Sequence, residues 1–208
     1  MPSVDPSVTP GRQRNLHPRK RYAAEFETAF LDRLRVMQDR LPARFEQQLI
    51  EGIQRSALHW SRCEDLRLLL ALILETGGLL RELCCATWHE WDVHRRLWNV
   101  PSRCPRFGSR TVPLSPKALE TLTELRQRAA PGQGTWFAHL GNERATAQQL
   151  RQAARRVDLG DYSFHRLRRE AICRMVQHRR SATLREVMLI AGASPNPPCL
   201  TRQKAARS

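Results

Sequence analysis

Apolar residues recur every three or four positions along most of this chain of 208 residues, and the pattern changes in one place. This spacing puts apolar side chains on one face of an α-helix, so it predicts a succession of amphipathic helices. Ser115 with Pro116, and Thr146 with Gln149 as a capping box, are typical of helix starts. The expected helices cover residues 23–41, 45–57, 64–76, 80–86, 116–129, 146–156, 165–178 and 183–191.

The change of pattern lies at residues 96–115, RLWNVPSRCPRFGSRTVPLS. Two short strand-like runs, Leu97–Pro101 and Arg110–Leu114, flank a turn that contains proline and glycine, which is typical of a β-hairpin. The predicted fold class is therefore mainly α with a small antiparallel β-sheet. Trp88, Trp91 and Trp98 are interpreted as core residues beneath the hairpin, with stacking on nucleic-acid bases as the alternative.

Positive charge gathers toward the end of the chain. Thirty-five Lys and Arg residues oppose 20 acidic residues, which gives a net charge of +15, and only Lys20, Lys117 and Lys204 are lysines. Residues 144–208 contain 14 basic and 4 acidic residues and so carry +10 of this charge. A basic patch within helices is typical of nucleic-acid binding, and the planar fork of arginine suits phosphate oxygens and guanine edges. Double-stranded DNA is the expected partner; RNA binding and a charge that serves only solubility are the alternatives.

Several other classes of protein are not expected. The longest apolar run, Leu68 to Leu74, is too short to span a membrane, and the N-terminus has no apolar segment typical of a secretion signal. The six cysteines contain no Cys-x-x-Cys, so we expect reduced thiols and a cytoplasmic location. His59 and Cys63 stand at helical spacing, but no second ligand pair completes a zinc site, so we expect neither a metal nor another cofactor.

Four stretches in order resemble the catalytic domain of the tyrosine recombinases, the phage integrase family. Residues 68–101, LLLALILETGGLLRELCCATWHEWDVHRRLWNVP, are similar to the opening helices and first strand of that domain. Residues 109–126, SRTVPLSPKALETLTELR, are similar to its third strand and the helix that follows. Residues 164–176, FHRLRREAICRMV, are similar to its His-x-Leu-Arg box, and residues 184–194, LREVMLIAGAS, to the helix before its nucleophile.

The resemblance implies a domain organisation for the chain. We expect a disordered basic arm at residues 1–21, N-terminal helices at 22–60, a recombinase-like catalytic-type domain at 61–194 and a flexible basic tail at 195–208. The family cuts DNA by attack of a Tyr hydroxyl on a phosphodiester, while two Arg residues and one or two His or Lys residues stabilise charge and handle protons. Preorganised cations aimed at phosphate oxygens lower such a barrier.

Residue by residue, only the His-Arg box matches the family. His165 and Arg168 fall on its His and second Arg, whereas Leu79 stands in the slot of the first Arg, and Arg81 lies nearly on the opposite side of a helix. The position that corresponds to the family's Lys in the β-hairpin lies near Pro105. Ala193 stands at the position of the family's late His or Trp, and the position of its nucleophile lies near Arg202. The only two tyrosines, Tyr22 and Tyr162, precede the His-Arg box. Ser194, Cys199 and Thr201 lie near the position of the missing Tyr, but we do not expect any of them to act as a substitute nucleophile.

We therefore predict a DNA-binding, integrase-like pseudoenzyme without strand-cleaving activity, which acts as a regulatory or accessory factor of a mobile element. Its partners are expected to be duplex DNA and either an active recombinase or a second copy of itself. The alternatives are an active recombinase that uses Arg81, Arg106 or the nucleophile of a partner, and a degraded fragment that has lost its function.

No catalytic residue is assigned, and His165 with Arg168 is interpreted as the remnant of a site. Arg168 has two further interpretations: it pairs with a core carboxylate such as Glu82, or it forms a working catalytic pair with His165. The predicted DNA contacts are His165, Arg166, Arg168, Arg169, Arg103, Arg106, Arg110, Arg151 and Arg155.

Overall fold

The computed structural model describes residues 41, 44–103, 108–160, 163–178, 187 and 190. The chain divides into two units, residues 1–38 and 39–208, and every described residue belongs to the second. The predicted basic arm and C-terminal tail lie outside the described residues. So do the predicted helices 23–41 and 183–191, apart from Leu41, Val187 and Ile190.

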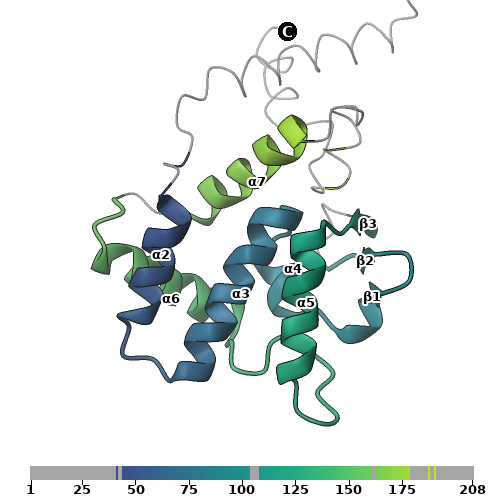
Figure 1. The fold of residues 1–208 in the computed structure, drawn as a ribbon, viewed down its shortest axis with the longest axis horizontal. Coiled ribbons are helices and arrows are strands. Elements are labelled where there is room, and N and C mark those ends of the chain that lie inside the picture. The colour runs from purple at the N-terminus through teal and green to yellow at the C-terminus, as the bar shows by residue number, and fades with distance from the viewer. Residues whose placement is uncertain are drawn as a thin grey trace, which may run out of the picture. The chain divides into compact units, whose positions relative to one another are not determined.

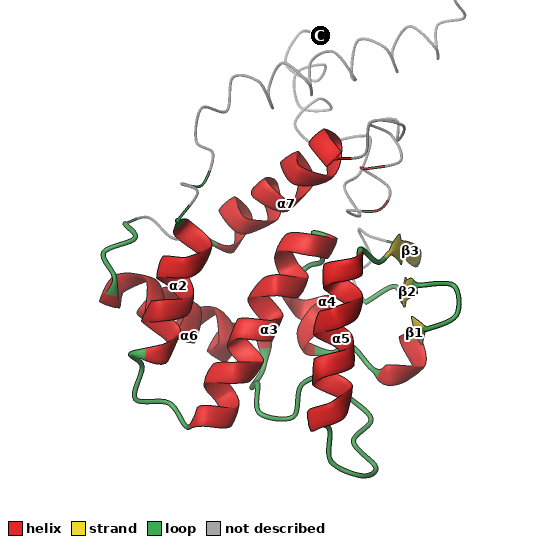
Figure 2. Cartoon of the chain, viewed as in Figure 1, coloured by secondary structure: helices red, strands yellow, loops and turns green. Residues whose placement is uncertain are grey.

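The described part of the chain is mainly helical, which confirms the predicted class (Figures 1 and 2). Helix α3 is central and contacts α2, α4, α5 and α7, while α2 also packs on α6. The helices are α2 (Phe45–Gln54), α3 (Trp60–Thr76), α4 (Leu80–Cys84), the 3-10 helix η1 (Trp88–Glu90), α5 (Pro116–Arg128), α6 (Glu143–Arg156) and α7 (Phe164–His178).

A small antiparallel sheet of three strands lies beside α4 and α5 in Figure 1. The strands are β1 (Trp91–Asp92), β2 (Leu97–Val100) and β3 (Arg110–Pro113), in the order β1-β2-β3. The predicted hairpin is confirmed as β2 and β3, with Trp98 opposite Val112. Strand β1 escaped prediction because two residues are too few to show an alternating pattern.

The core forms around α3 because this helix is covered on most sides. Its residues Leu66, Leu68, Leu69, Leu70, Leu72 and Ile73 are each at most 1% exposed. Trp98 is fully buried, which confirms its interpretation as a core residue. Trp88 and Trp91 are half-buried and pack against the same core.

Two predicted helix starts are wrong. Helix α3 begins four residues before the expected start at residue 64, with His59 as its N-cap, whose Nδ1 accepts the Ser61 N–H at 3.3 Å. Helix α6 begins at residue 143, because the side chain of Asn142 accepts the Ala145 N–H at 2.9 Å. The expected capping residue, Thr146, is instead buried inside that helix.

Other helix limits follow recognisable local causes. Ser115 caps α5 as predicted, since its Oγ accepts the Ala118 N–H at 3.1 Å. Helix α2 ends before the expected Ala57, which is exposed. A Cβ atom on Gly52 of α2 would lie 2.2 Å from the carbonyl oxygen of Ala153 in α6. The close contact between these two helices therefore requires glycine at position 52.

Candidate nucleic-acid interface

Helix α7 carries the His-x-x-Arg pair between its core face and its solvent face. Ser163 starts the helix, since its Oγ and its carbonyl oxygen accept the Arg166 N–H at 3.3 and 3.0 Å. Leu167 and Ala171 are fully buried and anchor one face in the core. The cationic and imidazole side chains of its first turns differ in exposure: His165 and Arg169 are exposed, whereas Arg166 and Arg168 are partly buried.

Helix α7 packs against the junction between α3 and α4. Gly77 ends α3 with a φ of 60°. A Cβ atom at this position would lie 3.5 Å from Met175 and 3.8 Å from both Ala171 and Ile172 of α7. Because Arg168 lies one turn before Ala171, this contact brings its guanidinium toward the charges carried by α4 and its neighbours.

One of those charges is the buried carboxylate of Glu82, which is paired with Arg110 of β3. The Nη1 and Nη2 atoms of Arg110 donate to the Oε1 and Oε2 atoms of Glu82 at 2.5 and 2.6 Å. The side chains of Arg110 and Glu82 are only 8% and 3% exposed. The Nε of Arg110 also donates to the carbonyl oxygen of Ile190 at 2.9 Å. Arg110 therefore connects the sheet, α4 and Ile190.

Arg168 keeps a positive charge in a partly buried position. Burial lowers the pKa of Arg168 to about 10; the carboxylate of Glu82 opposes this lowering and the charge of Arg110 adds to it. The guanidinium is therefore protonated at neutral pH. The charges of Glu82 and Arg110 therefore both act on Arg168, in opposite directions.

A second ion pair, which is partly buried, holds the connection between β2 and β3 against η1. Glu90 accepts hydrogen bonds from the Trp98 Nε1 at 3.0 Å and from the Arg103 Nη1 at 3.1 Å. The Nη2 of Arg103 also pairs with Glu90 and donates to the carbonyl oxygen of Cys85 at 2.8 Å. Arg103 therefore holds the end of β2 against the segment between α4 and η1.

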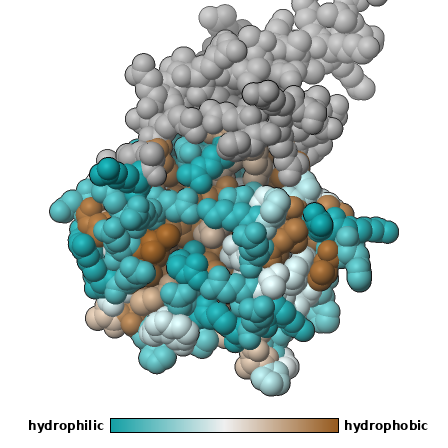
Figure 3. Space-filling model, in the orientation of Figure 1, coloured by the Kyte–Doolittle hydropathy of each residue, from teal (hydrophilic) through white to brown (hydrophobic). Residues whose placement is uncertain are grey.

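Helix α6 presents further arginines to solvent. Its residues Leu150, Ala153 and Ala154 are buried. Its opposite face includes the exposed residues Arg144, Arg151, Arg155 and Arg156. In the face of the molecule seen in Figure 3, hydrophilic side chains predominate and apolar ones form small separate patches.

The comparison with known proteins decides the family. The model of the phage integrase family matches residues 43–192, which is most of the chain. The chain belongs to the phage integrase family. No curated protein sequence is significantly similar to the chain.

Solved structures share the fold at low sequence identity. XerA recombinase is 16% identical with a TM-score of 0.56, over 81% of this chain and 64% of that one. The lambda integrase catalytic core is 20% identical with a TM-score of 0.57, over 76% of this chain and 94% of that one. A lambda integrase dimer bound to a COC′ core site is 18% identical with a TM-score of 0.57, over 81% of this chain and 49% of that one. The chain thus spans between about half and two thirds of the longer relatives, and it has the fold of the lambda integrase catalytic core.

In this integrase-family chain, position 79 is the N-cap of α4. The Leu79 N–H donates to the Oε2 of Glu82 at 2.8 Å. Arg81 is exposed, whereas the adjacent Glu82 is buried, so these two side chains point to different environments. The remaining slots that the resemblance assigns lie outside the described residues: Pro105, Ala193 and Arg202, together with Arg106 and Tyr162.

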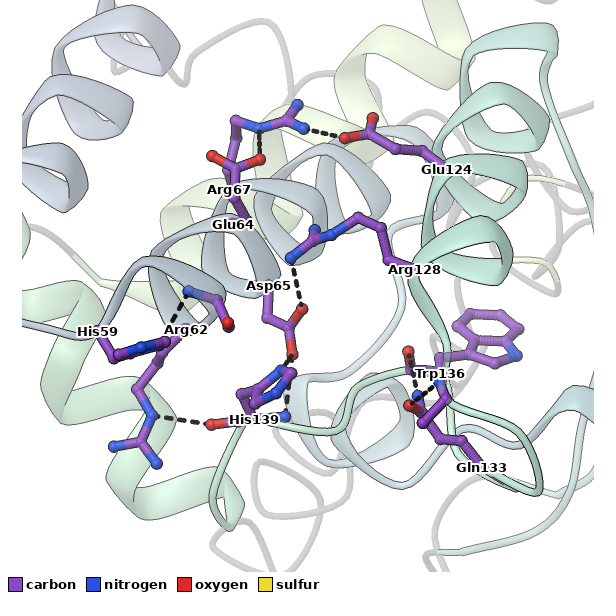
Figure 4. Close-up of polar contacts among 12 residues, drawn as sticks. His59, Arg62, Glu64, Asp65, Arg67, Glu124, Arg128, Gln133, Trp136 and His139 are labelled. Carbon is purple, nitrogen blue, oxygen red and sulfur yellow. Dashed lines mark hydrogen bonds and ion pairs between the residues drawn. The ribbon is translucent and has the colours of Figure 1, made fainter.

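A different polar network lies around the start of α3 (Figure 4). The buried carboxylate of Asp65 accepts the His139 N–H at 3.0 Å and lies 3.2 Å from the His139 Nδ1 and 3.6 Å from the Arg128 Nη2. Arg62 donates to the carbonyl oxygen of His139 at 2.8 Å. Asp65, Arg128 and His139 line a small hollow, and the contacts join α3, the end of α5 and the loop before α6, so we interpret them as structural.

Within the described ranges, no group of three or more metal-ligating side chains comes together. Cys63 donates to the carbonyl oxygen of Ile53 at 3.5 Å, and His59 caps α3. In the same ranges, no helix combines the length and the apolar character that crossing a bilayer requires.

The sequence did not reveal the two ion pairs that organise the site. A carboxylate inside the apolar stretch LLRELCC requires a partner, because an unpaired buried charge is strongly unfavourable. The sequence shows such a carboxylate at Glu82, but it does not identify the partner, Arg110, which is 28 positions away. Only the packing of the hairpin against α4 brings the two together.

Proposed function

We propose that this chain is a DNA-binding integrase-family protein that does not cleave DNA by itself. It acts in the cytoplasm as a regulatory or accessory factor in the recombination, integration or transcription of a mobile element. One observation carries this proposal. Helix α7 keeps a cationic Arg168 close in sequence to the exposed His165 and Arg169, whereas position 79, which corresponds to the first Arg of the family, is a leucine. The site supplies groups that bind phosphate, while the partner cation that the family uses for catalysis is replaced by an apolar side chain.

We assign direct phosphate contact to the basic side chains that reach solvent or its boundary. These are His165, Arg166, Arg168 and Arg169 of α7 and Arg151 and Arg155 of α6, with Arg106 retained in the proposal. Arg103 and Arg110 have internal carboxylate partners, and breaking a buried pair exposes the other charge to an apolar environment. We therefore assign these two residues an indirect role.

Structures of relatives support the choice of partner. Lambda integrase has been solved as a dimer bound to a COC′ core site and as a tetramer bound to a Holliday junction. We propose by analogy that this chain binds duplex DNA together with a second copy of itself or with an active recombinase.

A salt titration tests the binding part of the proposal. Fluorescence anisotropy with labelled duplex DNA should show an affinity that falls with salt, and each phosphate contact contributes about −0.9 to the slope of log affinity against log salt. Arg169→Gln should reduce the magnitude of this slope. Arg95→Gln is the matched control, because Arg95 is 79% exposed on the turn between β1 and β2 and the change in charge is the same. A slope near zero, or stronger binding to an RNA duplex of equal length, would contradict the proposal.

A trapping experiment tests the absence of cleavage. The protein is incubated with nicked duplexes that capture a covalent protein–DNA intermediate, and denaturing gels are examined for a shifted band. We expect none with this protein alone. A band that maps to any side chain of this chain would support the alternative of an active recombinase with substituted residues. A band that appears only with an added recombinase, and maps to that protein, would support the accessory role.

A further inference from the structure

Charged side chains from three helices form a connected network at the first turn of α2. Glu46 of α2 accepts a hydrogen bond from the Arg174 Nη1 of α7 at 3.4 Å and another from the Lys117 Nζ of α5 at 3.3 Å. The Nε of Arg174 also donates to the Oε1 of Glu170, one turn earlier on α7, at 3.0 Å. Positive and negative charges therefore alternate along the network, in the order Lys117, Glu46, Arg174 and Glu170.

The network reaches from solvent into a buried position. The side chain of Lys117 is 52% exposed, those of Glu46 and Arg174 are 25% and 32% exposed, and that of Glu170 is 6% exposed. A single exposed ion pair contributes little to stability, whereas charges connected in a network contribute more. Glu170 holds the Arg174 side chain against α7, so the bond from Arg174 to Glu46 connects α7 itself to α2.

The main contact of α7 is apolar and lies against α3. Ala171 and Met175 of α7 lie beside Gly77, where α3 ends. Apolar burial is a non-directional interaction, so it restrains the angle of a helix less than a hydrogen-bonded charge pair does. The bond between Glu46 and Arg174 therefore adds a directional restraint to α7.

We propose that Glu46 is a positioning residue for DNA binding: through Arg174 it sets the orientation of α7, and with it the place of the exposed His165 and Arg169. Arg169 and Arg174 are about 7.5 Å apart along the axis of one helix, so a change of angle at Arg174 also moves the first turns of α7. This inference rests on the proposed function, because it presupposes that α7 contacts DNA.

Removing the charge of Glu46 separates positioning from general electrostatics. Glu46→Gln makes the chain more positive by one charge, which by itself strengthens binding to a polyanion. Loss of positioning weakens binding, so the two effects have opposite signs. Glu51→Gln is the matched control, because it makes the same change on the same helix. Glu51 is 44% exposed and pairs with the neighbouring Arg55 at 3.8 Å.

The experiment measures duplex DNA affinity and hydrogen exchange of the α7 amides for six forms of the full chain, well below the melting temperature of each. These are the wild type, Glu46→Gln, Glu46→Asp, Glu51→Gln, Arg174→Gln and the double variant Glu46→Gln/Arg174→Gln. We expect Glu46→Gln to weaken DNA binding by about twofold to fivefold, the range of a surface ion pair, and to speed exchange in α7. Glu51→Gln should do neither. Glu46→Asp should bind DNA with an affinity between those of the wild type and Glu46→Gln, because it keeps the charge on a shorter side chain.

The double variant tests whether Glu46 acts through Arg174. If it does, Glu46→Gln causes no further loss once Arg174 is replaced, so the double variant should bind DNA no more weakly than Arg174→Gln. Equal losses from Glu46→Gln with and without Arg174 would overturn the positioning role. So would a Glu46→Gln protein that binds DNA as tightly as Glu51→Gln. A folded wild type that does not bind DNA would instead refute the proposed function.

Discussion

Replacing Arg168 with methionine should make the free protein more stable while weakening its binding to DNA. Burial lowers the pKa of Arg168 to about 10, with Glu82 opposing and Arg110 reinforcing the effect. A lowered pKa means that the folded state disfavours the charged form, by about 1.4 kcal/mol for each unit. The lowering from the ordinary pKa of arginine therefore corresponds to a penalty on charged Arg168 on the order of 3 kcal/mol at neutral pH. Methionine has a similar length and carries no charge, so Arg168→Met removes this penalty and leaves the Glu82–Arg110 pair intact.

The assay compares thermal unfolding and DNA binding for the same proteins at pH 7. A stabilisation of about 1–3 kcal/mol should raise the melting temperature by several degrees for a chain of this size. Binding should weaken by about tenfold or more, as expected for loss of one charge-assisted contact to a phosphate. Trp98 provides the unfolding signal, because it is fully buried and donates to Glu90.

A loss of stability in the Arg168→Met protein would contradict this prediction. If Arg168 were the structural partner of Glu82, its removal would leave an uncompensated buried carboxylate and would destabilise the fold by about 3–5 kcal/mol. The two interpretations of Arg168 therefore differ in the sign of the change in stability. Unchanged DNA binding by a folded Arg168→Met protein would separately exclude a phosphate contact at this residue.

Three further predictions concern the scaffold that presents the site. Leu167→Ala should destabilise the protein by about 2–5 kcal/mol in denaturant unfolding, because the side chain is fully buried; a loss below about 1 kcal/mol would contradict the packing of α7. Gly52→Ala should destabilise it by about 1–3 kcal/mol or more, since the new methyl group would meet the Ala153 carbonyl oxygen, and a neutral effect would show that α2 and α6 separate easily. Asn142→Ala should cost about 1 kcal/mol through loss of the α6 N-cap, whereas Asn142→Asp should retain most of the stability.

The helices and the hairpin could be predicted because each depends on a local pattern. Leu66, Leu69 and Ile73 of α3 face the core at helical spacing, and Ser115 caps α5 with its own side chain. The errors arose where a local signal had a competitor. Asn142 and Thr146 are both good capping residues, and the sequence does not show that the second is buried. Helix α3 starts earlier than its apolar stripe because its first turn is held by His59 rather than by core contacts.

The site was only partly predictable, for a different reason. The sequence motif shows that His165 and Arg168 lie one turn apart on the same helix. The exposure of each arginine, in contrast, depends on the carboxylate with which it pairs in the folded protein. Arg103 and Arg110 were predicted as DNA contacts from their place in a basic hairpin, yet both have carboxylate partners that are distant in the sequence. Net charge therefore indicates the class of ligand, whereas ion pairing determines which cations remain available for it.

The charge of Arg168 should also make DNA binding depend on pH. A phosphate beside Arg168 would stabilise its charged form, so DNA binding should raise the pKa of Arg168 above its value of about 10 in the free protein. Between these two values, binding requires uptake of a proton, and the affinity for DNA should fall as the pH rises through about 10. At neutral pH the side chain is already protonated, so no proton is taken up and affinity should be nearly independent of pH. The chain has only three lysines, which keeps the background titration in this range small. Affinity measured from neutral to alkaline pH should therefore decline more steeply for the wild type than for Arg168→Met, and equal profiles for the two proteins would show that the Arg168 charge is not linked to DNA binding.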